Sequence, residues 1–224
     1  MATELFRPFR GKNYESGFGG LGTKLLVLGE SHYVGKDDYA RKFLDQGMAR
    51  FTTRVVKDFW TTKEGAPYLK KDFFGRLHRL LTGLDNTTLK QIQEAWNTVA
   101  FANYIPIFAG DGIDSDEGEG HSAAKRAKHW RAAREEFPGM LKELKPDRVL
   151  VIGKVNWNNI ELGSDVKAKL KISDGISRDL WRLPTDQGNS ALSTWVYHTS
   201  RGLDSIPTMR SILQKLMNTD KSVE

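Results

Sequence analysis

The sequence predicts a three-layer α/β/α protein, in which helices cover both faces of a central four-stranded parallel sheet. Four apolar segments that each stop abruptly at polar residues lead to this prediction: KLLVLGESHY, TVAFANY, RVLVIGK and TWVYHTS. A strand that is buried on both faces of a sheet has such an uninterrupted apolar run. The segments between them are long enough for at least one helix each, and strands that alternate with helices favour a parallel sheet.

In the first half of the chain, the spacing of apolar residues and the positions of turn-forming residues predict the strands and helices. The first strand ends at Gly29, and a helix follows in which apolar residues recur at spacings of three to five. Two shorter helices then flank a turn at residues 83–86, before the second strand begins. The expected elements are strand 25–29, helix 37–60, helix 70–81, helix 87–96 and strand 98–104.

The second half of the chain continues the alternation of strands and helices. An acidic loop leads into a long helix with an apolar stripe, which we expect to be kinked or broken near Pro138. Residues 166–189 fit neither the helical nor the strand pattern and stay unassigned. The remaining expected elements are helix 122–144, strand 148–153, helix 154–162, strand 194–198 and helix 205–217.

Length and composition limit the kinds of protein that this chain can be. Its 224 residues fit a single domain spanning 1–224, with an irregular, glycine-rich lead-in over residues 1–23. Cysteine is absent, which excludes disulfides, cysteine nucleophiles, zinc–thiolate sites and cysteine-bound iron–sulfur clusters. No apolar run approaches the roughly 18 residues of a membrane span, and the first residues lack the apolar core of a secretory signal. We therefore expect a cytoplasmic protein without a membrane segment.

The charge distribution makes a polyanionic partner plausible on physical grounds. The formal net charge is +6, and residues 125–134 hold five basic side chains and no acid. Residues 111–119 hold five acids and no base. Gly118 stands in that stretch where a calcium-binding loop needs an oxygen ligand, so we expect a mobile acidic loop and no metal site.

Polar side chains follow each predicted strand at the point where it ends. Because ligands bind outside the carboxyl ends of strands in open α/β sheets, we expect these side chains to share one edge. An Asn amide offers a donor and an acceptor to a base edge, and a hydroxyl followed by a guanidinium suits a phosphate. The residues concerned are Glu30, Ser31, His32 and Tyr33, then Asn103, then Lys154, and finally His198, Thr199, Ser200 and Arg201.

Taken together, these motifs resemble those of the uracil-DNA glycosylase superfamily. That superfamily has a Gly-Gln-Asp-Pro-Tyr or Gly-Glu-Ala-Pro-Gly motif after its first strand, a base-reading Asn that ends its second and a His-Pro-Ser loop after its last. The corresponding segments here are GESHY, FANYIP and HTSRG, and KPDRVLVIGKVNW is similar to the third strand and the start of the helix after it. The four segments occur in the same order over most of residues 24–202.

The resemblance implies a role for each residue. Glu30 would orient or deprotonate the attacking water, or stabilise the oxocarbenium-like sugar electrostatically. His198 would donate a hydrogen bond to the base oxygen where charge accumulates, and Asn103 would read the base edge. Tyr33 would form a wall of the base pocket, which Ser31 and His32 would also line. On the DNA, Ser200 would grip a phosphate, Arg201 or Leu203 would fill the gap left by a flipped nucleotide, and Lys154 would contact the backbone. The resemblance implies a DNA partner, a monomer, and no cofactor or metal.

The sequence also departs from the superfamily pattern. Ser31 replaces the catalytic Asp of one motif form, His32 and Thr199 replace prolines, and the cluster-binding cysteines of some branches are missing. Ordinary uracil is therefore not assumed to be the substrate. Some members remove modified cytosines in phage defence, so a hypermodified cytosine belongs to the expected range alongside a base-excision repair target.

Two other functions stay open on the sequence. A module that binds a modified base or nucleotide without cutting it would explain Ser31 in place of a catalytic Asp. An ester hydrolase would use Ser31 as nucleophile and His198 as base. However, no Asp or Glu lies a few residues before His198, and Ser31 is not in a G-x-S-x-G turn.

Overall fold

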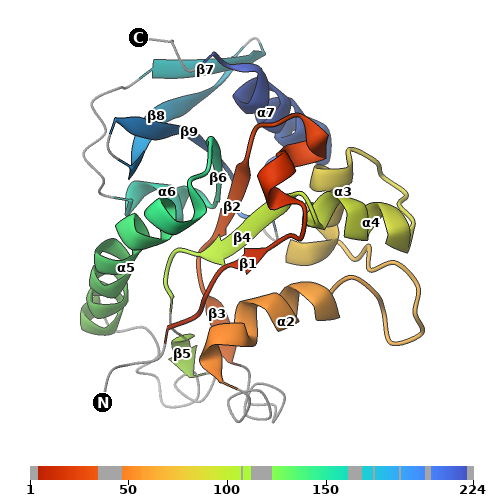
Figure 1. The fold of residues 1–224 in the computed structure, drawn as a ribbon, viewed down its shortest axis with the longest axis horizontal. Coiled ribbons are helices and arrows are strands. Elements are labelled where there is room, and N and C mark those ends of the chain that lie inside the picture. The colour runs from red at the N-terminus through yellow and green to blue at the C-terminus, as the bar shows by residue number, and fades with distance from the viewer. Residues whose placement is uncertain are drawn as a thin grey trace.

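A seven-stranded mixed sheet forms the centre of the protein, in the order β1-β4-β2-β6-β9-β8-β7 (Figure 1). The computed structural model describes residues 5–34, 47–106, 108–111, 123–160, 168–173, 175–186, 188–199 and 203–220. The strands of this sheet are β1 (Phe9–Arg10), β2 (Leu25–Gly29), β4 (Val99–Asn103), β6 (Arg148–Ile152), β7 (Ala168–Ser173), β8 (Ile176–Asp186) and β9 (Asn189–Val196).

Four neighbouring strands at the middle of the sheet are parallel, as the sequence predicted. β2 pairs with β4 on one side and with β6 on the other, and β6 pairs with β9. Every residue of β2, β4 and β6 is buried. Burial on both faces is the reason that these strands read as uninterrupted apolar runs.

The two edges of the sheet are antiparallel, which was not predicted from the sequence. β1 pairs with β4 at one edge, so the lead-in over residues 1–23 contains a short strand. At the other edge β7, β8 and β9 form a meander, which occupies most of the unassigned residues 166–189. In β7 the buried Leu170 and Ile172 alternate with exposed Lys169, Lys171 and Ser173. This short period-2 pattern is typical of a sheet with one wet face.

Two apolar cores lie on opposite faces of the sheet. Alternate residues of β2 point to opposite faces, so Leu25 and Val27 belong to one core and Leu26 and Leu28 to the other. The first core is covered by α3 (Phe73–Thr82), α4 (Leu89–Trp96) and α7 (Ile206–Asn218), and the second by α5 (Ala123–Leu144) and α6 (Lys154–Asn158) (Figure 1). Helices therefore pack on both faces.

Most of the predicted helices are confirmed, and three of them begin after a capping side chain. Asp72, Thr88 and Ser205 each accept a hydrogen bond from a backbone N–H of the first turn of α3, α4 and α7. The expected helix over 37–60 is described only from residue 47, where α2 (Phe51–Asp58) follows the 3-10 turn η3 (Met48–Arg50).

The long helix does not break near Pro138, so that part of the prediction is wrong, and the alternative of a kink stays a prediction. α5 continues through Pro138 to Leu144. The side chains of Phe137, Met140 and Leu141 on either side of the proline are buried against the sheet. Their packing offsets the backbone hydrogen bond that proline removes.

A second, two-stranded parallel sheet lies just beyond the carboxyl ends of β2 and β4. It consists of β3 (His32–Val34) and β5 (Phe108–Asp111), and neither strand was predicted. β3 begins three residues after β2 ends, so the GESHY segment continues into a strand instead of turning directly into a helix. In the part of the chain that the structure describes, no helix is long and apolar enough to cross a membrane.

Candidate functional site

The backbone after β2 is held from two sides at the carboxyl edge of the sheet. The carbonyl oxygen of Gly29 accepts hydrogen bonds from the Tyr104 N–H and the Asn156 side-chain amide, each at 2.9 Å. The carbonyl oxygen of Glu30 accepts one from the Ile105 N–H, also at 2.9 Å. The end of β4 and the start of α6 therefore fix the peptide that carries the Glu30 side chain, which is half-buried.

Asn103 lies across the end of β2, in space that only a glycine leaves open. Its side chain is buried, and a Cβ atom added at Gly29 would lie 2.4 Å from Asn103 Oδ1 and 3.2 Å from Phe101 Cζ. A real Cβ does not approach another atom as closely as 2.4 Å. Gly29 is thus part of the site, a role that was not predicted from the sequence. Its position at a strand end, directly before a carboxylate, was the available signal.

His32 is placed away from this edge, inside a small aromatic cluster. It is buried, its Nε2 lies 3.0 Å from the Thr52 hydroxyl, and its ring packs edge-on against Phe6 and Phe51. Burial lowers the pKa of His32 to about 3, so the ring is neutral at physiological pH. These are the contacts of a core residue, and base binding by His32 stays a prediction that its position does not support.

Ser31 and Tyr33 are the remaining predicted site residues of the GESHY segment. Ser31 is half-buried, and its hydroxyl oxygen is buried without a hydrogen-bond partner among the described residues. A Ser–His hydrogen bond of the kind that activates a nucleophile is therefore not formed. The side chain of Tyr33 lies outside the described residues.

His198 packs between the start of α6 and the start of α3. Its Cβ and Cδ2 atoms lie 3.8 Å from the position that a Cβ of Gly153 would occupy, and Asn156 Cβ lies 3.9 Å from the same position. The Phe73 ring lies beside the imidazole, with 5.5 Å between ring centroids. Gly153 has a φ of 103°, which favours glycine, and its N–H donates to the Val196 carbonyl at 2.8 Å.

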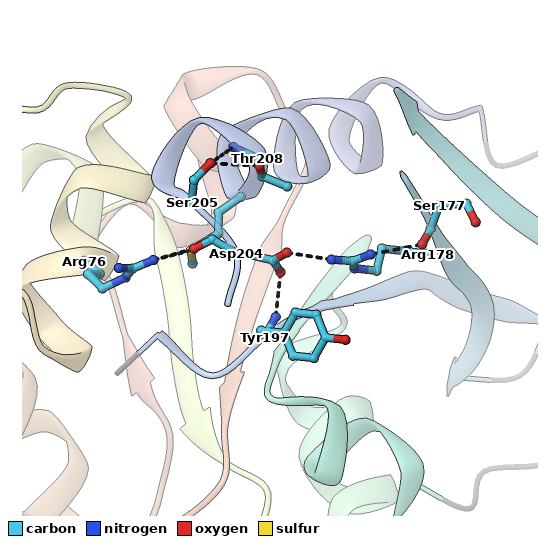
Figure 2. Close-up of polar contacts among 8 residues, drawn as sticks. Arg76, Ser177, Arg178, Tyr197, Asp204, Ser205 and Thr208 are labelled. Atoms are coloured by element: carbon cyan, nitrogen blue, oxygen red, sulfur yellow. Dashed lines mark hydrogen bonds and ion pairs between the residues drawn. The ribbon is translucent and has the colours of Figure 1, made fainter. Parts of the chain in front are cut away.

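A buried ion pair closes the loop that carries His198 (Figure 2). The Asp204 carboxylate accepts one hydrogen bond from Arg178 at 2.6 Å and another from the Tyr197 N–H at 2.8 Å. Arg76 also donates to the Asp204 carbonyl oxygen. Arg178 and Asp204 are both buried, at 9% and 5% exposed. Asp204 therefore ties the first residue of the loop to its last and fixes both to β8.

This ion pair was not predicted from the sequence. Arg178 lies in a strand that was not predicted, 26 residues before its partner. Its guanidinium also lies 4.5 Å from the centroid of the Trp195 ring on β9, so its cationic group is held by an aromatic face as well as by the carboxylate. An Asp directly before the capping Ser205 was the only local signal.

Aromatic rings connect the two halves of this edge. Phe73 lies 5.5 Å from His198 and 6.1 Å from Phe101, measured between ring centroids, and Phe101 reaches the position above Gly29 where Asn103 also lies. Residues that are far apart in sequence therefore meet through one continuous series of contacts. The described parts of the motifs at the ends of the first, second and fourth predicted strands therefore share one edge of the sheet.

The residues predicted to contact DNA have more varied positions. Lys154 is exposed at the first turn of α6, with its ammonium group 5.7 Å from the Trp195 ring centroid. Leu203 is 66% exposed, as a wedge residue would need to be. Ser200 and Arg201 lie outside the described residues, as do the acidic residues 112–119 and the side chains of residues 125–128.

The described residues contain no group of three or more His, Asp and Glu side chains that could hold a metal ion. No protein-family model matches the sequence, and no curated protein has significant similarity to it. Function is therefore inferred from the geometry of this edge and from the ordered motifs that form it.

Proposed function

We propose that the protein is a DNA glycosylase built on the three-layer fold of the uracil-DNA glycosylase superfamily. It hydrolyses the N-glycosidic bond of a flipped uracil-like or modified base, with a hypermodified cytosine in the expected range, and leaves an abasic site. The observation that carries the proposal is the convergence of Glu30, Asn103 and His198 on one edge of a parallel sheet. Each lies at or just beyond the carboxyl end of a different strand, and ligands of such sheets bind at this edge.

Glu30 acts on the sugar side of the bond. Its carboxylate stabilises the positive charge that develops on the sugar and orients the water that attacks the anomeric carbon. The carbon–nitrogen bond breaks with its electron pair going to the base, and the water proton passes to the carboxylate or to the departing base. The two hydrogen bonds on the Gly29 carbonyl and the one on the Glu30 carbonyl support this role, because they fix the backbone that carries the carboxylate.

Asn103 and His198 act on the base. The Asn103 amide offers one donor and one acceptor, which suits the edge of a pyrimidine that has been flipped out of the duplex. His198 donates to the base oxygen that gains negative charge, and one donor of this kind is worth about 3 kcal/mol. The Phe73 ring, half-buried beside His198, supplies an apolar surface next to these polar groups.

A panel of oligonucleotides tests this function. Purified protein is incubated with duplexes and single strands that carry uracil, hypoxanthine, hydroxymethylcytosine or glucosylated cytosine, and abasic sites are detected by alkaline cleavage. We expect strand cleavage at one class of modified base and none at unmodified DNA. Tight binding to one of these bases without any abasic site would contradict the glycosylase proposal and favour the binding module.

The binding module is the second candidate, because Ser31 stands where one form of the superfamily motif has its catalytic Asp. The ester hydrolase is less well supported, since the Ser31 hydroxyl is buried and lacks a hydrogen bond to His198. A hydrolase nucleophile needs both access and an adjacent base.

A further inference from the structure

A groove runs along α2. Two adjoining hollows form it, and they share Arg54, Lys57 and Asp58. One extends toward Gly47 and Arg50 at the start of the helix. The other extends beyond its end into residues 59–70. Because the hollows share these residues, they make one continuous groove, which we call the α2 groove.

The α2 groove is strongly basic. Two acidic side chains, Asp58 and Glu64, lie among the residues that line it, and five basic ones outnumber them. This leaves a formal charge of +3, against +6 for all 224 residues. The five basic residues are Arg50, Arg54, Lys57, Lys63 and Lys70. A concave surface of one sign raises the local concentration of ligands of the opposite sign.

Helix geometry arranges three of these cations in a row. Arg54 and Lys57 belong to α2, and Arg50 is the N-cap residue directly before it, with a helical backbone conformation. Spacings of four and then three residues therefore place the three on one side of the helix and spread them over about 10 Å of its axis. Arg54 and Asp58 form a long surface pair, at 3.9 Å between Nε and Oδ2, with both side chains more than a third exposed. Such pairs contribute little, so this one does not cancel the charge of the row.

The helix that carries the groove also contacts the segment that follows the candidate site. Phe51, which lines one end of the groove, and Thr52 both contact the His32 ring, and His32 lies two residues after Glu30. In Figure 1, α2 lies beside β3, the strand that His32 begins. The groove is therefore linked through His32 to the backbone that carries Glu30.

We propose that the α2 groove binds the phosphates of a nucleic-acid strand next to the nucleotide that enters the site. A row of cations along a groove matches a strand that carries one phosphate about every 3.4 Å of duplex axis. Thr53 and Thr61 also line the groove, and threonine hydroxyls are donors of the kind that position phosphates. This inference rests on the proposed function in one respect, namely the identity of the nucleotide that the bound strand presents to the site.

The test measures DNA binding as a function of salt concentration. The groove variant carries Arg50→Gln, Arg54→Gln and Lys57→Gln. The control variant carries Lys90→Gln, Lys142→Gln and Lys171→Gln, which removes three exposed cations that do not line the groove. Both are titrated against a fluorescein-labelled duplex without a modified base, and anisotropy is read at several salt concentrations. Equal melting temperatures of the two variants establish that both are folded.

We expect the slope of log K against log salt to become shallower by about 2 to 3 in the groove variant and to stay near the wild-type value in the control. An unchanged slope in the groove variant overturns the proposal. Polyglutamate of equal length is titrated in the same way. If it binds the wild type as tightly as the duplex does and binds the groove variant more weakly, the groove recognises any polyanion, which overturns the choice of nucleic acid. Because the duplex contains no target base, this result is independent of the abasic-site panel, which tests the proposed function alone.

Discussion

The two halves of the candidate site are held by different kinds of contact. The Gly29 half, which comprises Gly29, Glu30 and Asn103, is fixed by backbone hydrogen bonds and by a close steric fit inside the parallel centre of the sheet. The His198 half is a loop after β9, fixed by the Arg178–Asp204 ion pair to the antiparallel part. The parallel centre of the sheet therefore positions Asn103 directly, whereas the antiparallel edge holds the ends of the loop that carries His198.

This difference predicts how each half fails. The contact between Tyr197 and Asp204 depends on a buried carboxylate, and removing the cation that pairs with it leaves this charge buried without compensation. A steric fit fails only when atoms are added to it. Substitutions at Arg178, Gly29 and His32 separate these behaviours, and the expected loss of stability is largest at Arg178.

Arg178→Met is expected to have the largest effect, with a loss of about 3 kcal/mol or more in the free energy of unfolding. It leaves the buried Asp204 carboxylate without its cation, although the Tyr197 N–H still donates to it. Urea unfolding measures the loss, and hydrogen exchange at the Tyr197 amide reports the loop directly. Lys169→Met is the matched control, since Lys169 pairs with Asp179 at the surface and should contribute at most about 1 kcal/mol. Equal losses in the two variants would contradict a special role for the buried pair.

Gly29→Ala should cost about 1–3 kcal/mol, because the added methyl group overlaps the Asn103 amide oxygen. Displacing Asn103 should also slow base release about a hundredfold, since a shift of about 1 Å in a positioning group has effects of this size. Gly139→Ala on α5 is the control, as nothing lies within 4 Å of the added methyl group there. If Gly29→Ala retained both stability and base release, the steric account of the Gly29 half would be wrong.

His32→Gln should change the pH dependence of stability. Since the pKa of His32 falls from 6.5 to about 3 on burial, the unfolded chain binds the proton more readily. The stabilisation from neutral His32 is complete above about pH 6.5 and declines as the pH falls toward 3, by about 1 kcal/mol per pH unit. Unfolding free energies between pH 7 and pH 5 should therefore fall less steeply in the variant than in the wild type. Parallel curves would mean that His32 is not buried as described.

The parallel centre could be predicted from sequence because burial on both faces leaves uninterrupted apolar runs, as in Leu25–Gly29. The antiparallel edge was missed because its strands are half-exposed, and β8 contains Pro184 at an exposed position. Whether such a segment forms a strand depends on its burial next to strands far away in sequence, and not on its local propensity.

The candidate site was predictable to a similar extent. The positions of Glu30, Asn103 and His198 at one edge follow from the strands that precede them. The orientation of His32 does not, because it is set by contacts with Phe6 and with Thr52, 20 residues away. Gly29 and the Arg178–Asp204 pair were missed for the same reason, since their roles exist only once distant segments are in contact.

The most direct test of the central claim is single-turnover base release by Glu30→Gln, His198→Ala and the control Glu143→Gln, which changes an exposed carboxylate on α5. The substrate is the modified duplex that the panel identifies, and binding is measured in parallel. We predict that Glu30→Gln and His198→Ala release the base at least a hundredfold more slowly while they bind the duplex nearly as tightly as the wild type. Wild-type rates in both variants would contradict the assignment of this edge as the active site.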